Sequence, residues 1–266
     1  MEYAAAKDDP VVDLALERDE LTRRAKAVGL DDFSLDETLR RLARKHLAHR
    51  LQHGRYIVRP APAPSPRLWS LDPVAEAVLR RLDVDYFVSW HGALWHYGLI
   101  DQQSRTLTVA VTRRKRDVEL GASRIHFVLL SPRKFFGYAT VTDLEWPVEM
   151  ATVSRAIIDS FDHPEYVGPN ALVVEALRRA SAEEKLDAAE LVDNALRLGS
   201  PTLNRRLGFF MELLEIPGFE RLEPYLGRGY AEPLFPGKEP QRKMDVDRRW
   251  RVYRDPAIIT TALELK

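Results

Sequence analysis

Apolar positions in the first part of the chain recur at helical spacing in two segments separated by a short turn. Residues 11–28 have the period of an amphipathic helix, as one helix or as two broken near Arg18, and Gly29 is a typical stop. The next segment repeats the period, and Ser34 with Glu37 three residues later has the form of a capping box with Ser34 as N-cap. The pattern predicts two helices joined by a turn.

A short segment with a glycine near its middle predicts a β-hairpin after the second helix. Residues 47–52 and 55–58 would form its strands, and His53 with Gly54 would form a two-residue loop. The register of that loop pairs Leu51 with Tyr56 and His49 with Val58, and these four residues would share a packed face, with Arg50 and Arg59 on the other.

Residues 60–66 hold prolines at alternate positions, which predicts a stiff extended spacer about 20 Å long at about 3.1 Å per residue. Few other segments of the chain exclude regular structure so clearly. We therefore expect an N-terminal domain over residues 1–60, a linker over 61–70 and a larger domain over 71–266.

Beyond the spacer, short apolar runs alternate with helical patterns, as in a mixed α/β domain. Residues 217–240 hold five prolines and four glycines, so regular structure should largely end there. The predicted strands are 86–88, 107–111, 125–130, one strand or hairpin within 138–148, and a last strand within 250–253. The predicted helices are 73–82, 90–97 capped by Ser89, 152–161, one from Pro169, 186–198, and one opened by Ser200 and Pro201.

The distribution of charge changes this picture more than its total does. The chain carries 40 basic and 40 acidic residues, but residues 1–37 hold 5 basic and 11 acidic side chains, and residues 38–60 hold 7 basic ones and no acid. A capped helix with an unneutralised basic face, followed by a basic hairpin, has the parts of a winged helix–turn–helix. In that motif the second helix enters the DNA major groove and the hairpin lies along the backbone or the minor groove. The candidate DNA-binding residues are Ser34, Arg40, Arg41, Arg44, Lys45, Arg50, His53, Arg55 and Arg59.

Several classes of protein are excluded or disfavoured. Without cysteine the chain has no disulfide, thiolate zinc site, iron–sulfur cluster or cysteine nucleophile. No stretch approaches the ~18 apolar residues of a membrane span, and no secretory signal is visible, so we expect a cytoplasmic protein without a membrane partner. Phosphate-binding glycine loops and H-E-x-x-H are absent. No catalytic residue, metal or cofactor is predicted.

Four other groups of residues have side chains that could carry chemistry. His46, His49 and His53 are spaced for a metal only on a continuous helix, which the predicted hairpin interrupts. The Trp-His pairs at 90–91 and 95–96 fit a core better than a ligand pocket. The remaining two are Arg155 with Asp159, which predict an intrahelical ion pair, and Asp143, Glu145 and Lys134, which have the residue types of a nuclease metal site in an unusual order.

Four segments of the chain serve as landmarks for a family resemblance. They are Tyr-Phe-Val-Ser-Trp-His-Gly-Ala-Leu-Trp-His-Tyr-Gly-Leu at 86–99, Lys-Phe-Phe-Gly at 134–137, Val-Ser-Arg-Ala-Ile-Ile-Asp at 153–159 and Leu-Asn-Arg-Arg-Leu-Gly at 203–208. In these landmarks and in their order, the chain resembles the AbiEi-type antitoxins of abortive-infection toxin–antitoxin systems over roughly residues 20–215. Gly54 and Tyr56 match the family's hairpin glycine and the aromatic residue after it, whereas Lys45 or His46 stands where the family often has glycine before the first strand.

The resemblance implies an α+β protein with an N-terminal winged helix–turn–helix and a larger mixed α/β antitoxin domain. It further implies an autorepressor that binds repeats in the promoter of its own operon. The implied protein partner is a co-transcribed nucleotidyltransferase-like toxin, which family members counter in many cases without a stable complex.

Other readings stay open at the level of sequence. A second basic run, Arg113, Arg114, Lys115 and Arg116, lies between two predicted strands and is a second DNA contact, a toxin-facing patch or a solvated loop. The alternatives to the antitoxin are a metal-dependent enzyme acting on nucleic acid and a protein-interaction module in which 38–60 is a solvated face.

Overall fold

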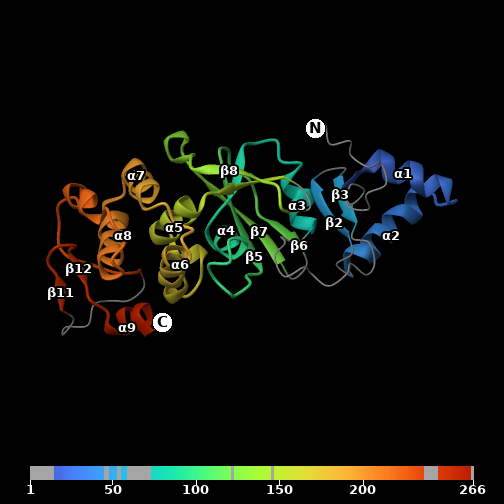
Figure 1. The fold of residues 1–266 in the computed structure, drawn as a ribbon. Coiled ribbons are helices and arrows are strands. Elements are labelled where there is room, and N and C mark those ends of the chain that lie inside the picture. Colours follow the sequence, from blue (N-terminus) through green and yellow to red (C-terminus); the bar gives the residue numbers. More distant parts are fainter. Residues whose placement is uncertain are drawn as a thin grey trace.

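The structure is a computed structural model that describes residues 15–44, 48–52, 55–58, 73–120, 123–144, 147–236 and 245–264 (Figure 1). It confirms the α+β class. Two hydrophobic cores are present in these ranges, a small one before the predicted linker and a large one after it. The predicted linker and the boundaries on either side of it lie outside the described residues.

The N-terminal unit consists of two helices and a three-stranded antiparallel sheet of order β1-β3-β2. The prediction of helix across 11–28 is wrong for residues 15–17, which form a strand on the edge of β3. That edge offers unpaired backbone groups, and pairing with them satisfies more donors and acceptors than one further helical turn. The elements are β1 (Ala15–Glu17), α1 (Arg18–Ala27), α2 (Asp32–Arg44), β2 (Ala48–Gln52) and β3 (Arg55–Val58).

The two helices pack through Leu21 and Ala25 of α1 and Leu35 and Leu39 of α2, all buried. Gly29 ends α1 as predicted. Its φ of +79° lies in the left-handed region that glycine adopts without strain, so the chain can reverse within a few residues.

The hairpin has a different register from the one predicted. Gln52 pairs with Arg55, as a two-residue loop requires, but an irregularity between Arg50 and Gln52 shifts the rest by one residue. His49 therefore lies opposite Ile57 and not Val58. An extra residue in one strand of an antiparallel pair has this effect, and hydrophobic spacing alone does not reveal it.

The large domain is built on a six-stranded mixed sheet of order β6-β7-β5-β4-β9-β8. Two pairs are parallel, β5 with β7 and β4 with β9, and the other neighbours are antiparallel. The strands are β4 (Tyr86–Val88), β5 (Thr106–Val111), β6 (Val118–Leu120), β7 (Ser123–Leu129), β8 (Tyr138–Val141) and β9 (Val148–Ala151).

Helices α5 to α8 lie together on one side of this sheet (Figure 1), and α5 contacts α4, α6, α7 and α8. All of α5 except its two ends is buried, so it is the centre of the helical layer. The helices are α3 (Pro73–Leu79), α4 (Trp90–His96), α5 (Val153–Asp162), α6 (Asn170–Ala182), α7 (Ala188–Leu198), α8 (Pro201–Leu213) and α9 (Pro256–Glu264). Short 3-10 helices are η1 (Pro132–Lys134), η2 (Pro164–Tyr166) and η3 (Phe219–Tyr225).

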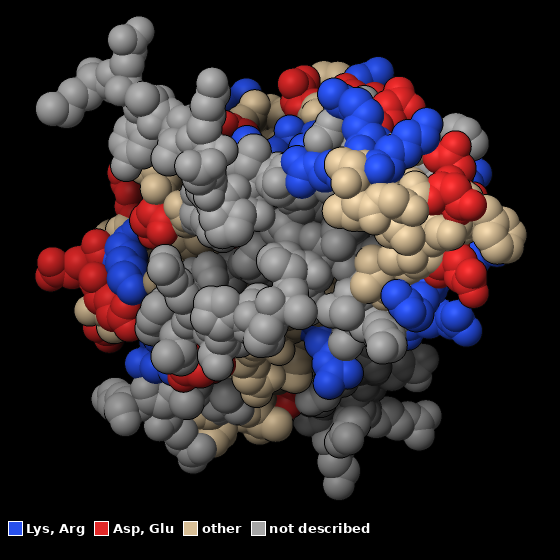
Figure 2. Space-filling view, turned by 90° about the vertical axis from the view of Figure 1, so that its right-hand side faces the viewer, with Lys and Arg blue, Asp and Glu red and all other residues tan. Residues whose placement is uncertain are grey.

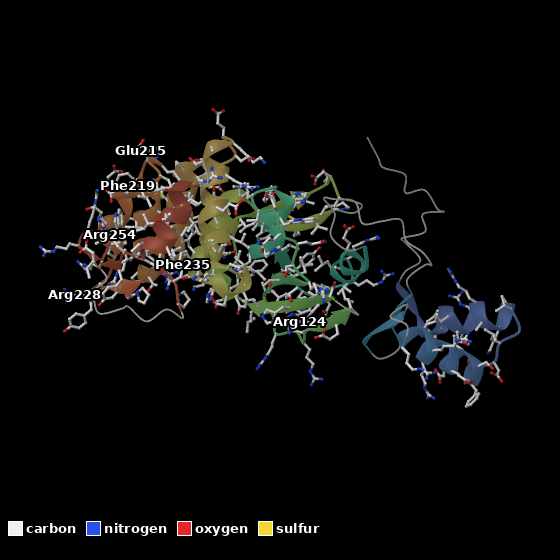
Figure 3. The ribbon with its side chains drawn as sticks, turned by 90° about the horizontal axis from the view of Figure 1, so that it is seen from below. Arg124, Glu215, Phe219, Arg228, Phe235 and Arg254 are labelled. Atoms are coloured by element: carbon white, nitrogen blue, oxygen red, sulfur yellow. The ribbon has the colours of Figure 1, made fainter. Side chains whose placement is uncertain are left out.

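The C-terminal segment returns to cover α8. Its small sheet has the order β10-β12-β11, made of β10 (Glu232–Pro233), β11 (Val246–Asp247) and β12 (Val252–Tyr253). Phe235 packs with Phe161 of α5 and Phe210 of α8 (Figure 3). The sequence pattern missed α9, which packs on α6 and adds Ile258 and Ala262 to the core.

Within the described ranges, no helix combines the length and the apolar character needed to cross a membrane.

Gly208 of α8 is required by a close approach of Trp250. A Cβ at position 208 would lie 2.0 Å from Cζ3 of the Trp250 ring, which is fully buried. We expect Gly208→Ala to lower the free energy of unfolding by at least about 1–3 kcal/mol, the usual cost of overpacking. Urea denaturation followed by circular dichroism measures this.

The control is the same replacement in a Trp250→Ala background. There the ring is gone and alanine is the better helix former by about 1 kcal/mol, so Gly208→Ala should stabilise. Equal costs in both backgrounds would contradict the proposed contact.

Candidate nucleic-acid interface

Helix α2 presents three arginines to solvent. Arg40, Arg41 and Arg44 are all exposed, and none of them forms an ion pair within the part of the chain that the structure describes. Leu35 and Leu39 hold the opposite face of α2 against α1. A rigid helix with one buried face and unneutralised guanidinium groups on the other can bind phosphates.

The helix begins earlier than predicted, because Asp31 and not Ser34 caps it. The Ser34 amide donates to Oδ1 of Asp31 at 2.7 Å, and the Leu35 amide donates to the Asp31 carbonyl at 3.0 Å. Hydrogen bonds from the Ser34 side chain and from the Ser34 amide hold the pKa of Asp31 below its usual value. Aspartate caps as well as serine does and adds a negative charge at the positive end of the helix. Ser34, half-buried inside the first turn, is therefore a helical residue and not the cap.

The structure describes only some of the other residues that were predicted to contact DNA. Arg50 lies on β2 opposite Tyr56, and Arg55 lies on β3 opposite Gln52. Lys45, His53 and Arg59 lie outside the described residues, as does the tip of the predicted wing. Figure 2 looks onto the end of the molecule that carries this unit and shows Lys and Arg side chains in separate groups beside a band of uncharged residues.

The second basic run is a loop between β5 and β6, as predicted, and a distant aspartate organises it. Arg113 donates to the carbonyl of Asp83 and Lys115 pairs with its carboxylate, which lowers the pKa of Asp83. Arg114 and Arg116 are exposed and have no acidic partner in the described part of the chain. Along the run, Arg113 and Lys115, which are bonded to Asp83, thus alternate with the exposed side chains of Arg114 and Arg116. Asp83 lies 30 residues earlier in the sequence, so residue spacing could not reveal this pairing.

The four landmarks of the family resemblance meet in and around one buried network. Arg155 and Asp159 form the predicted ion pair on α5, with Nη2 to Oδ1 at 2.9 Å and Nε to Oδ2 at 3.0 Å. Ser89 occupies the N-cap position of α4, as predicted, but its side chain makes no capping hydrogen bond. Its hydroxyl donates to Oδ2 of Asp159 at 2.7 Å, a strong bond because the acceptor is a carboxylate. The Trp90 indole donates to the Asp159 carbonyl at 3.0 Å. Burial raises the pKa of Asp159, and the bonds from Arg155 and Ser89 oppose that rise.

The second landmark covers the guanidinium of Arg155. Its Cζ lies 4.3 Å from the centroid of the Phe136 ring, and Cζ of Arg197 lies 3.9 Å from the same ring. A Cβ at Gly137 would lie 3.1 Å from Cβ of Arg155, and the Gly137 φ of +73° is a conformation that glycine adopts without strain. A desolvated cation–π contact such as that of Arg155 contributes about 2 kcal/mol, and an exposed one such as that of Arg197 about 0.5–1 kcal/mol. Phe136 and Gly137 therefore have a mainly structural role, which the spacing of residues in the sequence did not predict.

The fourth landmark ties the C-terminal segment to this core. Arg205 is buried and donates to the carbonyls of Leu226 and Tyr230, and it pairs with Glu232 at 2.9 Å. Arg206 donates to the carbonyl of Phe161 at the end of α5. The sequence assigned neither arginine a role, because their partners lie more than 20 residues away along the chain.

The residues considered for a nuclease site are not brought together. Asp143 lies in the turn after β8 and not on a strand, with His96 at 3.5 Å, and Lys134 lies 3.7 Å from Asp162. Glu145 lies outside the described residues. Among the residues that the structure describes, no group of three His, Cys, Asp or Glu side chains could hold a metal ion. The tryptophan–histidine pairs belong to the core as expected at Trp90 and His91, which are buried.

Comparison with known proteins addresses the fold. No family model matches the chain, and no curated protein matches its sequence. Among solved structures, the crystal structure of the RV2827C protein from Mycobacterium tuberculosis is similar, with a TM-score of 0.63 and 13% identity over 96% of this chain and 91% of that one. This similarity extends over nearly the whole chain and shows a shared fold.

Removing Arg155 should leave the buried carboxylate of Asp159 without its counter-charge. We expect Arg155→Met to lower the free energy of unfolding by about 3–5 kcal/mol, and the double variant Arg155→Met/Asp159→Asn to recover part of that loss. Urea denaturation is the measurement. The control is Arg221→Met, which breaks the exposed pair of Arg221 with Asp193 and should cost at most about 1 kcal/mol. A double variant less stable than the single one would contradict the argument.

Proposed function

We propose that the chain is a cytoplasmic DNA-binding autorepressor and antitoxin of a toxin–antitoxin operon. The observation that carries the proposal is the exposed row of Arg40, Arg41 and Arg44 on α2, without acidic partners in the described part of the chain. Together with α1, Gly29 and the β1–β3–β2 sheet, this row supports a winged helix–turn–helix in which α2 enters the major groove of promoter repeats.

The charge of the first 60 residues supports the same function. Phosphate contacts release counterions and make affinity strongly dependent on salt. The acidic residues before α2 lower the net charge of the unit and so weaken binding to arbitrary DNA, while the local field at α2 stays positive. Arg114 and Arg116 extend the positive surface of the large domain and are a second candidate contact, either for DNA or for the toxin.

The antitoxin part of the proposal rests on the family resemblance. Its landmarks surround the Ser89–Asp159–Arg155 network and the start of α8. A shared buried framework supports a shared domain type. We infer that the surface of this domain counters a nucleotidyltransferase-like toxin, with or without a stable complex.

DNA binding is tested on duplex DNA from the region upstream of the gene. We expect Arg40→Ala/Arg44→Ala to weaken binding strongly in a gel shift and to reduce the slope of log affinity against log salt by about 1.8, at about 0.9 per phosphate contact. Both side chains are exposed, so circular dichroism should not change.

A matched control removes the same charge elsewhere. Arg228 and Arg248 are also exposed, in the C-terminal region, and Arg228→Ala/Arg248→Ala should bind like the unaltered chain. An Arg114→Ala/Arg116→Ala variant tests the second patch. Unchanged binding and salt slope in Arg40→Ala/Arg44→Ala would refute α2 as the DNA-binding element.

The antitoxin role is tested by co-expression with the product of a neighbouring nucleotidyltransferase-like gene. Colony counts should fall when that product is expressed alone and recover when this chain is supplied. Because neutralisation is assigned to the large domain, Arg40→Ala/Arg44→Ala should restore growth as well as the unaltered chain does. Failure of the unaltered chain to restore growth would refute the antitoxin role and leave DNA binding unaffected.

A further inference from the structure

The early start of α2 places an aromatic residue on its DNA-facing side. Phe33 lies in the first turn of the helix, where 75% of its surface is exposed to solvent. Arg40 and Arg44 follow seven and eleven residues later, so all three Cα atoms lie within about 20° of one line along the helix at 100° per residue. The exposed ring thus lies in line with two exposed arginines that have no ion-pair partner in the described part of the chain.

The charges along α2 divide it into two halves. The exposed residues of the first half, Asp32, Phe33 and Glu37, include no positive charge, and the exposed residues of the second half are the three arginines. Acidic groups repel phosphates, so the first half is unsuited to the DNA backbone. In helix–turn–helix proteins the N-terminal residues of the recognition helix contact base edges. The distribution of charge in α2 agrees with that arrangement.

We propose that Phe33 contacts the 5-methyl group of a thymine in the major groove and thereby contributes to the choice of sequence. This inference rests on the proposed DNA-binding function. The thymine methyl is the apolar group that base pairs present in the major groove, and phenylalanine is among the side chains that contact it. The arginines at the other end of α2 hold the phosphates, which fixes the depth and register at which Phe33 meets the bases.

The test removes one methyl group from the DNA and leaves the rest unchanged. A duplex is first selected from a randomised pool with the full-length chain, and each thymine in it is then replaced singly by deoxyuridine. We expect replacement at one or two positions to weaken binding about three- to fivefold, the value for the burial of one methyl group. Phe33→Ala should bind the thymine and deoxyuridine duplexes equally, at the weakened level.

Val28, in the connection between α1 and α2, provides a matched control. Its side chain is 74% exposed but lies outside α2, so Val28→Ala should keep the sensitivity to deoxyuridine. Phe33→Leu should keep part of it. Because Phe33 is so exposed, its replacement should leave the circular dichroism spectrum unchanged.

The outcomes separate this inference from the function on which it rests. If no duplex is enriched, the DNA-binding function itself fails. If a duplex binds but no thymine is sensitive to deoxyuridine, or if Phe33→Ala keeps the sensitivity, DNA binding stands and the role of Phe33 is refuted. A change in oligomeric state of Phe33→Ala, measured by sedimentation with DNA affinity unaltered, would assign Phe33 to contact between copies of the chain and overturn the proposal.

Discussion

The pair of Arg155 and Asp159 is the interaction on which the large domain depends. Its two side chains are almost completely withdrawn from water, and an ion pair in such surroundings depends on good geometry and on further partners. Ser89 donates to Asp159 and the Phe136 ring covers the guanidinium, while Nη1 of Arg155 is buried without a hydrogen-bond partner in the described part of the chain. These partners come from separate parts of the chain. Ser89 follows β4, Phe136 precedes β8 and α5 follows β9, so one charged group contacts residues beside the ends of three strands. A buried charge tolerates little change in the groups around it.

The N-terminal unit follows the opposite principle. Among the residues of this unit whose burial the structure describes, Leu21, Ala25, Leu35 and Leu39 form the core, and the arginines of α2 remain in water. A small unit of this kind gains little stability from hydrophobic burial. Caps and strand pairing therefore matter more here, as Asp31 at the start of α2 and β1 on the edge of β3 show. Because Leu35 and Leu39 are the buried core residues described on α2, most of the surface of this helix is open to a ligand.

Local signals in the sequence predicted most elements, and non-local contacts explain the differences. Gly29, the strands around β5 and β7, and the helix opened by Ser200 and Pro201 were recognisable because each depends on neighbouring residues. The strand at 15–17, the bulge in the hairpin and the pairing of Ser89 with Asp159 each depend on a partner far along the chain. In the candidate site, the basic face of α2 was predictable from charge spacing. The position of Phe33 was not, because Asp31 and Ser34 are both good caps and only the structure shows which one starts the helix.

The return of the C-terminal segment over α8 has a consequence for synthesis. Trp250, Ile258 and Ala262 complete a core whose other members begin near residue 75. A ribosome therefore exposes the N-terminal unit long before the large domain can close, because Trp250, Ile258 and Ala262 are made after the other residues of that core. An activity of the N-terminal unit does not have to wait for these residues, whereas an activity of the large domain requires them. In this protein the order of translation separates the two domains in time.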